Sequence, residues 1–274
     1  MGVVNVTPDS FSDGGAFLDR HAAVNHGLRL AFEGADLLDI GGESTRPGAD
    51  PVPAHEELAR VLPVIEGIRA ANDAVRISID TSKAAVAAAA LDAGADYVND
   101  VTALRGDPGM APLVAERGVD VCLMHMVGTP RTMQSEARYD DVVADVRAFL
   151  AGRIETATAA GIALERIEVD PGIGFGKTVE HNLELLGRMR ELTSLGRPVV
   201  LGTSRKSFLG RITGRETAER LPATIATVVM AYERGAEVFR VHDVAPARDA
   251  LAVAAATLAR PWPATTPRTT TRTS

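Results

Sequence analysis

The sequence has a single cysteine, no long apolar run and no leader-like beginning, and each absence limits where the protein works. Cys122 lies in the apolar run 119–124, so we expect a small buried hydrophobe, no disulfide within the chain and a reducing compartment. No apolar stretch is long enough to cross a bilayer. Strand-like residues follow Met1 directly, which is not the pattern of a signal peptide. We therefore expect a cytoplasmic protein with no membrane partner.

Aromatic residues are also scarce, and positive charge is not in excess. Phe, Trp and Tyr make up 4% of the chain, too few to predict a stacking platform for single-stranded nucleic acid. Acidic residues outnumber basic ones, 36 to 29, which gives a formal net charge of −7. This balance predicts no nucleic-acid partner, so an anionic substrate has to be met by a local cluster of basic side chains.

Short apolar runs alternate about eight times with helix-like segments along the 274 residues. Such alternation predicts a parallel sheet, and eight units predict a closed (β/α)8 barrel, an α/β fold with a single domain over residues 1–260. The tail 261–274 is rich in Pro and Thr and is expected to be disordered. The expected strands are 3–6, 36–40, 75–79, 96–98, 119–124, 167–170, 197–201 and 237–241, and the expected helices are 19–33, 53–71, 83–93, 111–117, 139–160, 179–190, 221–234 and 245–258.

The stretch 167–177 (IEVDPGIGFGK) combines several of these signals. It begins as a β-branched strand, stops on Asp170, and meets Pro171, which has no N–H for the ladder. The three glycines at 172, 174 and 176 let the backbone approach a ligand closely. A flat molecule that donates hydrogen bonds would fit against such a fixed anion. The competing interpretation is a tight strand-to-helix turn with an incidental aspartate.

Acidic and amide side chains recur where the other expected strands end. Asp39, Asp80, Asp170 and Asn99 all fall at such ends, and in barrels of this kind the loops after the strands build the active site. Metal ligation is weakly indicated, because no HxH or HExxH spacing is present. A nucleophile–base pair is also weak, since Ser204 has no evident histidine partner. Recognition of an amino-substituted heterocycle fits better, because carboxylates accept and an amide both donates and accepts.

Basic side chains form a second group at the same expected end of the barrel. Arg46, Lys206, Arg240 and His242, with Asn5 close by, indicate a phosphate or pyrophosphate site in an otherwise acidic protein. One alternative is a set of structural ion pairs with the acids. Another is a Schiff base on Lys206, which is disfavoured because Arg205 and a substrate anion would lie beside the amine.

Two polar loops complete the expected site: 7–15, which is long and carries Phe11, and 41–48, which is rich in glycine. With the strand ends, they make up segments that resemble the dihydropteroate synthase family, pterin-binding TIM barrels of folate biosynthesis and the target of sulfonamides. The resemblance spans about residues 1–258. The segments are MGVVNVTPDSFSDGG (1–15), DIGGESTRPGA (39–49), SIDTSK (78–83), VNDV (98–101), LMHM (123–126), DPGIGFGKT (170–178), GTSRKSFLG (202–210) and RVHDV (240–244).

The resemblance implies a transferase that joins 4-aminobenzoate to 6-hydroxymethyl-7,8-dihydropterin diphosphate, with Mg²⁺ as cofactor. It also implies a homodimer, and an S_N1-like reaction in which carboxylates stabilise a cationic pterin methylene. By motif, the resemblance implies that the pterin is held by Asp80, Asn99, Asp170 and Lys206 and lined by Met124, Phe175 and Gly202. It implies that the diphosphate meets Asn5, Arg240 and His242, with Asn5 near Mg²⁺. The aminobenzoate is implied to lie among Phe11, Thr45, Arg46, Pro47 and Ser204.

The implied catalytic residues are Asp80, Asp170, Lys206, Arg46 and Phe11. Two alternatives stay open: a non-catalytic paralogue that keeps the pterin pocket, and a methyltetrahydrofolate methyltransferase-type barrel, which would not need the two polar loops. In one respect the sequence departs from the family, whose members usually carry a further segment before the motif that here starts at Met1.

Overall fold

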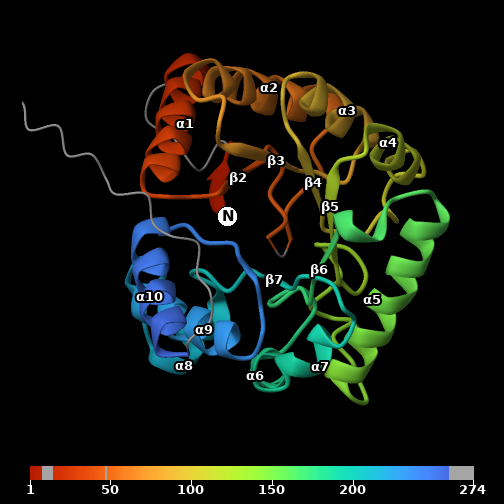
Figure 1. Ribbon diagram of the computed structural model, residues 1–274, viewed down its shortest axis with the longest axis vertical. Helices are drawn as coiled ribbons and strands as arrows, with labels where there is room; N and C mark the ends of the chain where they lie inside the picture. The colour runs from red at the N-terminus through yellow and green to blue at the C-terminus, as the bar shows by residue number, and fades with distance from the viewer. Residues whose placement is uncertain (8–14, 47, 259–274) are drawn as a thin grey trace, which may run out of the picture.

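The computed structural model describes residues 1–7, 15–46 and 48–258. Within 15–46, it describes the side chains of residues 20–46. The strands lie at the centre and the helices form a ring around them (Figure 1). The expected tail at 261–274 lies outside the described residues. The strands are β1 (Gly2–Asn5), β2 (Leu37–Gly41), β3 (Arg76–Asp80), β4 (Tyr97–Asp100), β5 (Asp120–Met124), β6 (Ile167–Asp170), β7 (Val200–Leu201) and β8 (Val238–Phe239).

Parallel pairing and backbone hydrogen bonds close these strands into the expected (β/α)8 barrel. Strands β1 to β6 pair in chain order, and β7 pairs with β8. The β6–β7 gap is bridged where the Val169 N–H donates to Pro198 O at 3.0 Å. The β8–β1 gap is bridged where the Val3 N–H donates to Val241 O at 3.0 Å, and the Val241 N–H to Met1 O at 2.9 Å. The fold class predicted from sequence is therefore confirmed.

The helices agree with the expected ones except in four places. The first begins earlier, at Gly15; the expected helix 139–160 begins later, at Val142; the expected helix 179–190 is broken at Arg188 into two; and a short helix after β7 was not expected. The helices are α1 (Gly15–Phe32), α2 (Ala54–Ala71), α3 (Ala84–Asp92), α4 (Met110–Arg117), α5 (Val142–Ala159), α6 (Val179–Gly187), α7 (Met189–Thr193), α8 (Ser207–Thr213), α9 (Leu221–Glu233) and α10 (Val244–Thr257), with 3-10 turns η2 (Leu164–Arg166) and η3 (Thr217–Glu219).

On β2 and β4, the side chains that point into the barrel change from apolar to polar toward the carboxyl end. Because successive side chains alternate between the two faces of a strand, residues two apart share the inside. On β4, Tyr97 is fully buried with Leu37, Cys122 and Val200, and Asn99 follows one layer up. On β2, Leu37 is followed two residues later by Asp39, whereas β6 carries acids at both positions, Glu168 and Asp170. The carboxyl end of the barrel is thereby lined with hydrogen-bonding groups above an apolar floor.

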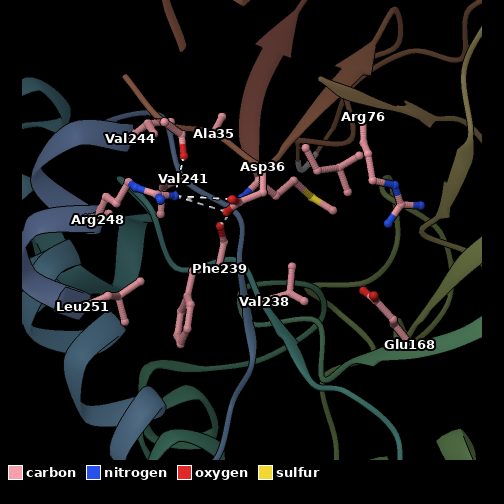
Figure 2. A pocket seen from close by; sticks show the side chains of 14 residues that line it. Ala35, Asp36, Arg76, Glu168, Val238, Phe239, Val241, Val244, Arg248 and Leu251 are labelled. Carbon is pink, nitrogen blue, oxygen red and sulfur yellow. Dashed lines mark hydrogen bonds and ion pairs between the residues drawn. The ribbon is translucent and has the colours of Figure 1, made fainter. Parts of the chain in front are cut away.

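The opposite end of the barrel opens into a cavity of about 200 Å³ (Figure 2). Its walls include Val238, Phe239 and Leu251. The polar groups here are already paired: Arg248 lies 3.3 Å from Asp36, and the Glu168 carboxylate accepts a hydrogen bond from the Tyr97 hydroxyl at 2.7 Å. This end therefore presents stability contacts rather than reactive groups, as is usual for such barrels. None of the described helices is long and apolar enough to cross a membrane.

Candidate active site

The strand register brings the polar strand ends into one group. Asp80 on β3 lies opposite Asn99 on β4, and Gly41 on β2 lies opposite Asp80 on its other side. On β5 and β6, Met124 lies opposite Asp170. Since these pairs sit at the carboxyl ends of parallel strands, Asp80 is a neighbour of Asn99, and Met124 is a neighbour of Asp170.

Arg240 is held between two acids near the barrel axis. Its Nε donates to Asp39 Oδ2 at 2.5 Å, and its Nη2 donates to Asp80 Oδ2 at 2.9 Å. Asp39 is fully buried and also accepts from Ser78 Oγ at 2.5 Å and Asn99 Nδ2 at 3.1 Å. A buried carboxylate needs such partners, because a lone charge there costs several kcal/mol.

These contacts show that Asp39 and Arg240 are bound to other residues of the protein. Asp39, which the sequence placed among the strand-end acids, lies one layer below them and holds Arg240 and Asn99 in place. Arg240, expected to meet the diphosphate, is an ion-pair partner of two acids here, as the alternative interpretation of the basic residues had it. Burial alone would lower the pKa of its guanidinium, but Asp39 and Asp80 outweigh burial and raise it.

Asp80 is an acid whose protonation changes near neutral pH. Burial and the neighbouring Asp39 charge raise its pKa to about 7, although Arg240 acts in the opposite direction. At neutral pH the carboxyl group is therefore divided between its acid and its anion. A ligand that donates hydrogen bonds would favour the anion and draw the proton away.

Asp170 and Lys206 face the glycine-rich loop that follows β6. Asp170 Oδ1 accepts the Gly172 N–H at 2.6 Å, and Lys206 Nζ donates to Ile173 O. Burial lowers the pKa of the Lys206 ammonium to about 8, even though Asp170 raises it. Lys206 is thus still mainly charged at pH 7, where it offers a cation beside the Asp170 carboxylate.

An apolar wall stands next to this charged pair. Met124 packs in a buried cluster with Val101, Met126 and Met133, and Phe175 packs against that cluster. The Lys206 ammonium lies 4.7 Å from the centre of the Phe175 ring, a cation–π distance. Gly202, the third residue expected to face the pterin, also lies near Lys206: a Cβ built on it would stand 3.7 Å from Nζ. The arrangement provides a flat apolar surface bordered by acids and one cation.

The sequence showed no histidine partner for Ser204, and the structure corrects this: Ser204 pairs with His242, which lies far along the chain. The Ser204 hydroxyl accepts from the His242 N–H at 3.2 Å and lies 3.0 Å from His242 Nδ1. Burial, together with Arg240 and Arg205, lowers the pKa of His242 to about 4. The imidazole is therefore neutral at pH 7 and can donate a hydrogen bond but carries no positive charge.

The remaining expected site residues lie on β1 and on the loop after β2. Asn5 ends β1 and lies opposite Gly41. Thr45 lines a cavity of about 270 Å³ at the carboxyl end, whose walls include Val101 and Met126, and Arg46 is exposed beside it. Phe11 and Pro47, the other two residues expected to contact aminobenzoate, lie outside the described residues.

A buried lysine–histidine pair was missed from the sequence. Lys177 is 4% exposed, and its Nζ lies 2.9 Å from both His125 Nδ1 and Phe175 O. Burial lowers the pKa of Lys177 to about 7, and burial with Lys177 lowers that of His125 to about 2. The pair ties the loop after β5 to the glycine-rich loop that carries Phe175. The lysine at the end of the GFGK stretch was the available signal.

Gly172 is required where these two loops meet. Its φ is +67°, and a Cβ built on it would stand 1.9 Å from His125 O. Gly172→Ala is therefore expected to lower the free energy of unfolding by about 3 kcal/mol, measured by urea denaturation. Gly152→Ala is the control, because Gly152 lies in α5 with nothing within 4 Å of its Cβ position. It should gain up to about 1 kcal/mol; equal stability of the two variants would contradict this account.

The sequence resemblance implies a Mg²⁺ site near Asn5, which can be compared with the metal-binding side chains of the described residues. Within residues 1–7, 15–46 and 48–258, no group of three or more His, Cys, Asp or Glu side chains is placed to hold a metal ion. Mg²⁺ commonly binds through substrate phosphates, water and only one or two protein oxygens. The amide oxygen of Asn5, at the end of β1, is a protein oxygen of the kind that such a site uses.

Comparison with known proteins identifies relatives across almost the whole chain. Residues 1–242 match the family model described as pterin binding enzyme. The dihydropteroate synthase of Escherichia coli strain K12 is 46% identical over 258 residues, which cover 94% of this chain and 91% of that protein.

Solved structures agree with the sequence relatives. The structure of Xanthomonas albilineans dihydropteroate synthase with 4-aminobenzoic acid has a TM-score of 0.89 and 53% identity, and covers 95% of this chain and 93% of that one. The Yersinia pestis enzyme in a sulfonamide drug complex also has a TM-score of 0.89, with 44% identity over 94% of this chain and 93% of that one.

Proposed function

Because the chain belongs to the dihydropteroate synthase family of pterin-binding enzymes, we propose that it performs the reaction of that family. It is a transferase of folate biosynthesis that joins 6-hydroxymethyl-7,8-dihydropterin diphosphate to 4-aminobenzoate. The products are 7,8-dihydropteroate and pyrophosphate. This is the reaction that the sequence resemblance implied.

The observation that best supports this function is the grouping of Asp80, Asn99, Asp170 and Lys206 beside the apolar wall of Met124 and Phe175. A pterin has one flat π-surface and an edge of N–H donors. The acids and the amide suit that edge, and the apolar wall suits the flat face. Barrel strands hold Asp80, Asn99, Asp170 and Met124, so little ordering of these groups is needed when the ligand binds.

In the proposed mechanism the C–O bond between the pterin methylene and the diphosphate breaks first, and its electron pair leaves with the diphosphate. The Asp170 and Asp80 carboxylates stabilise the positive charge left on the pterin methylene. The aminobenzoate amine then forms the C–N bond and gives up one proton to solvent. No covalent bond to the protein forms, so no nucleophilic side chain is needed.

The diphosphate end is assigned to Asn5, Arg240 and His242. Arg240 would exchange part of its contact with Asp80 for a phosphate oxygen, while Asp39 keeps it in place. Bound Mg²⁺, held by the diphosphate and by Asn5, would neutralise charge on the leaving group. Thr45, Arg46, Pro47, Phe11 and Ser204 are assigned to the aminobenzoate, where closure of the two polar loops would keep water from the cation.

A homodimer in the cytoplasm is part of the same proposal. Exposed apolar side chains on three mutually contacting helices support self-association: Leu183 on α6, Ile212 on α8 and Met230 on α9. The free, buried Cys122 is compatible with a reducing compartment. A monomer in sedimentation velocity at micromolar concentration would contradict the dimer.

Pyrophosphate release tests the activity and the cofactor together. With both substrates and Mg²⁺ present we expect steady release, and removal of Mg²⁺ with EDTA should lower the rate at least tenfold. Re-addition of Mg²⁺ should restore it. Release that continues unchanged in EDTA would exclude the cofactor assignment, whereas no release under any condition would exclude the function.

A further inference from the structure

Three charged residues outside the assigned substrate sites form a cluster beneath the loop that carries Thr45 and Arg46. The Lys83 ammonium, at the start of α3, donates to Glu43 Oε2 and to Glu57 Oε2, each at 2.6 Å. Glu43 begins the loop after β2, and Glu57 belongs to the first turns of α2. One cation thus joins the β2 loop, α2 and the segment that follows Asp80.

The cluster is largely shielded from solvent, so the loss of one charged partner is costly. The Glu57 side chain is 0% exposed, and those of Glu43 and Lys83 are 20% and 24% exposed. Burial alone would lower the pKa of Lys83, but the two carboxylates outweigh burial and raise it. Glu57 Oε1 is the one buried side-chain oxygen among the described residues that has no hydrogen-bond partner. Lys83 is therefore the partner that makes a buried Glu57 tolerable.

Further contacts pin both ends of the loop to the same place. Arg60 on α2 donates to Gly42 O at 2.7 Å, and the Val52 N–H donates to Glu43 Oε1 at 2.9 Å. Gly42 packs so closely on α2 that an added Cβ would stand 2.8 Å from Val61 Cγ1. The Glu43 side chain thus closes the loop through one oxygen and anchors it to Lys83 through the other.

Between these pinned ends, the described loop residues contact one another locally, as where the Ala49 N–H donates to Arg46 O at 3.1 Å. At its tip the Gly48 N–H donates to Pro130 O at 3.2 Å, and Asp50 lies 3.7 Å from Arg131 in an exposed ion pair. An exposed pair of this kind contributes little. The orientation of Thr45 and Arg46 therefore depends mainly on the anchored stem.

We propose that Lys83, Glu43 and Glu57 are positioning residues that fix the stem of the β2 loop and thereby set the affinity for 4-aminobenzoate. The proposal rests on the function proposed above. None of the three residues contacts a reacting atom in this account; they act through Thr45 and Arg46. Because Lys83 follows Asp80 by three residues, the same short segment carries a pterin-binding acid and the anchor of the aminobenzoate loop.

Glu43→Gln is the most selective test. Glutamine keeps an oxygen for the Val52 N–H but loses the charge that pairs with Lys83, while Glu57 keeps its partner. We expect the KM for 4-aminobenzoate to rise about tenfold and the KM for the pterin diphosphate to stay within twofold. Removing a negative charge near an anionic substrate would by itself lower that KM, so a rise indicates loss of positioning rather than long-range electrostatics.

Two further variants separate positioning from folding. Lys83→Met alone would leave Glu57 buried without a partner and is expected to fold poorly, so Lys83→Gln combined with Glu57→Gln replaces it. This pair should fold and show the same rise in KM as Glu43→Gln. The matched control is Glu66→Gln, which removes an equal charge from an exposed position further along α2 and leaves Arg60 and Lys83 with their partners. It should leave both KM values within twofold.

Hydrogen exchange provides a readout that does not depend on activity. Amides of residues 44–51 should exchange at least tenfold faster in Glu43→Gln than in the wild type, with the amides of α2 unchanged. If Glu43→Gln and the Lys83/Glu57 double variant both fold with wild-type KM and wild-type exchange, the positioning role is wrong. If the wild type makes no product, the proposed function fails, and the exchange rates alone decide the positioning of the loop.

Discussion

Replacing Lys206 with alanine is expected to lower kcat/KM about a thousandfold while the barrel stays folded. Lys206 lies over Phe175 and beside Asp170, where its charge would hold the pterin and help the diphosphate to leave. Loss of one charged group of this kind in a desolvated site typically costs two to three powers of ten. Steady-state pyrophosphate release measures the change, and circular dichroism checks the fold. Arg211→Ala, on the exposed face of α8, is the control and should retain the wild-type rate.

Removing the Lys206 charge should lower activity but increase the stability of the fold. Because burial holds the pKa of Lys206 near 8, below its unfolded value of 10.5, the charged amine destabilises the fold below pH 8. The cost is relieved as pH rises from 8 to 10.5. Lys206→Met removes the charge but keeps the apolar stem, and should raise the free energy of unfolding at pH 7 by about 2 kcal/mol. A destabilised methionine variant would contradict the burial argument.

Replacing Asp80 with alanine is expected to reduce kcat/KM by a factor of about 100 to 1,000. Asp80 is a proposed acceptor for the pterin edge and a stabiliser of the cationic methylene, and Arg240 keeps Asp39 as its partner when Asp80 is absent. The same assay measures the loss. Asp92→Ala, on the exposed end of α3, is the control. A rate within threefold of wild type would remove Asp80 from the site.

The raised pKa of Asp80 predicts that the free energy of unfolding depends on pH. Its folded pKa of about 7 lies above the ordinary value of 3.8, so the folded protein holds this proton more tightly than the unfolded chain. Stability from this group is therefore full below about pH 4 and is lost as pH rises to about 7. Relative to the wild type, Asp80→Asn should gain on the order of 2 kcal/mol between pH 4.5 and pH 8 in urea unfolding. A constant difference between the two proteins would contradict the raised pKa.

The barrel and the neighbours in its site could be predicted from sequence because they follow from local patterns. The eightfold alternation fixed the class of fold, and polar residues at strand ends such as Asp80, Asn99 and Asp170 converge in any parallel barrel. The expected roles of the two polar loops came from the resemblance to the family. The short helix α8 was missed because its seven residues are too few for a clear helical period.

Partner choice could not be predicted, because it depends on distances between residues far apart in the chain. The sequence places Arg240 and Asp39 at comparable barrel positions but does not say that they pair across 201 residues. The same holds for Ser204 with His242 and for Lys177 with His125. Once paired, these residues have altered pKa values, so their charge at pH 7 differs from what the residue type alone suggests.

The measurement that tests the central claim most directly is the amount of each product formed by the purified protein. Dihydropterin diphosphate, 4-aminobenzoate and Mg²⁺ are supplied, and pyrophosphate and 7,8-dihydropteroate are quantified in the same samples by chromatography. We predict equal amounts of the two products, neither of which forms when the pterin substrate is omitted. Binding of the pterin without either product would contradict the assignment and indicate a protein that keeps the pocket but not the reaction.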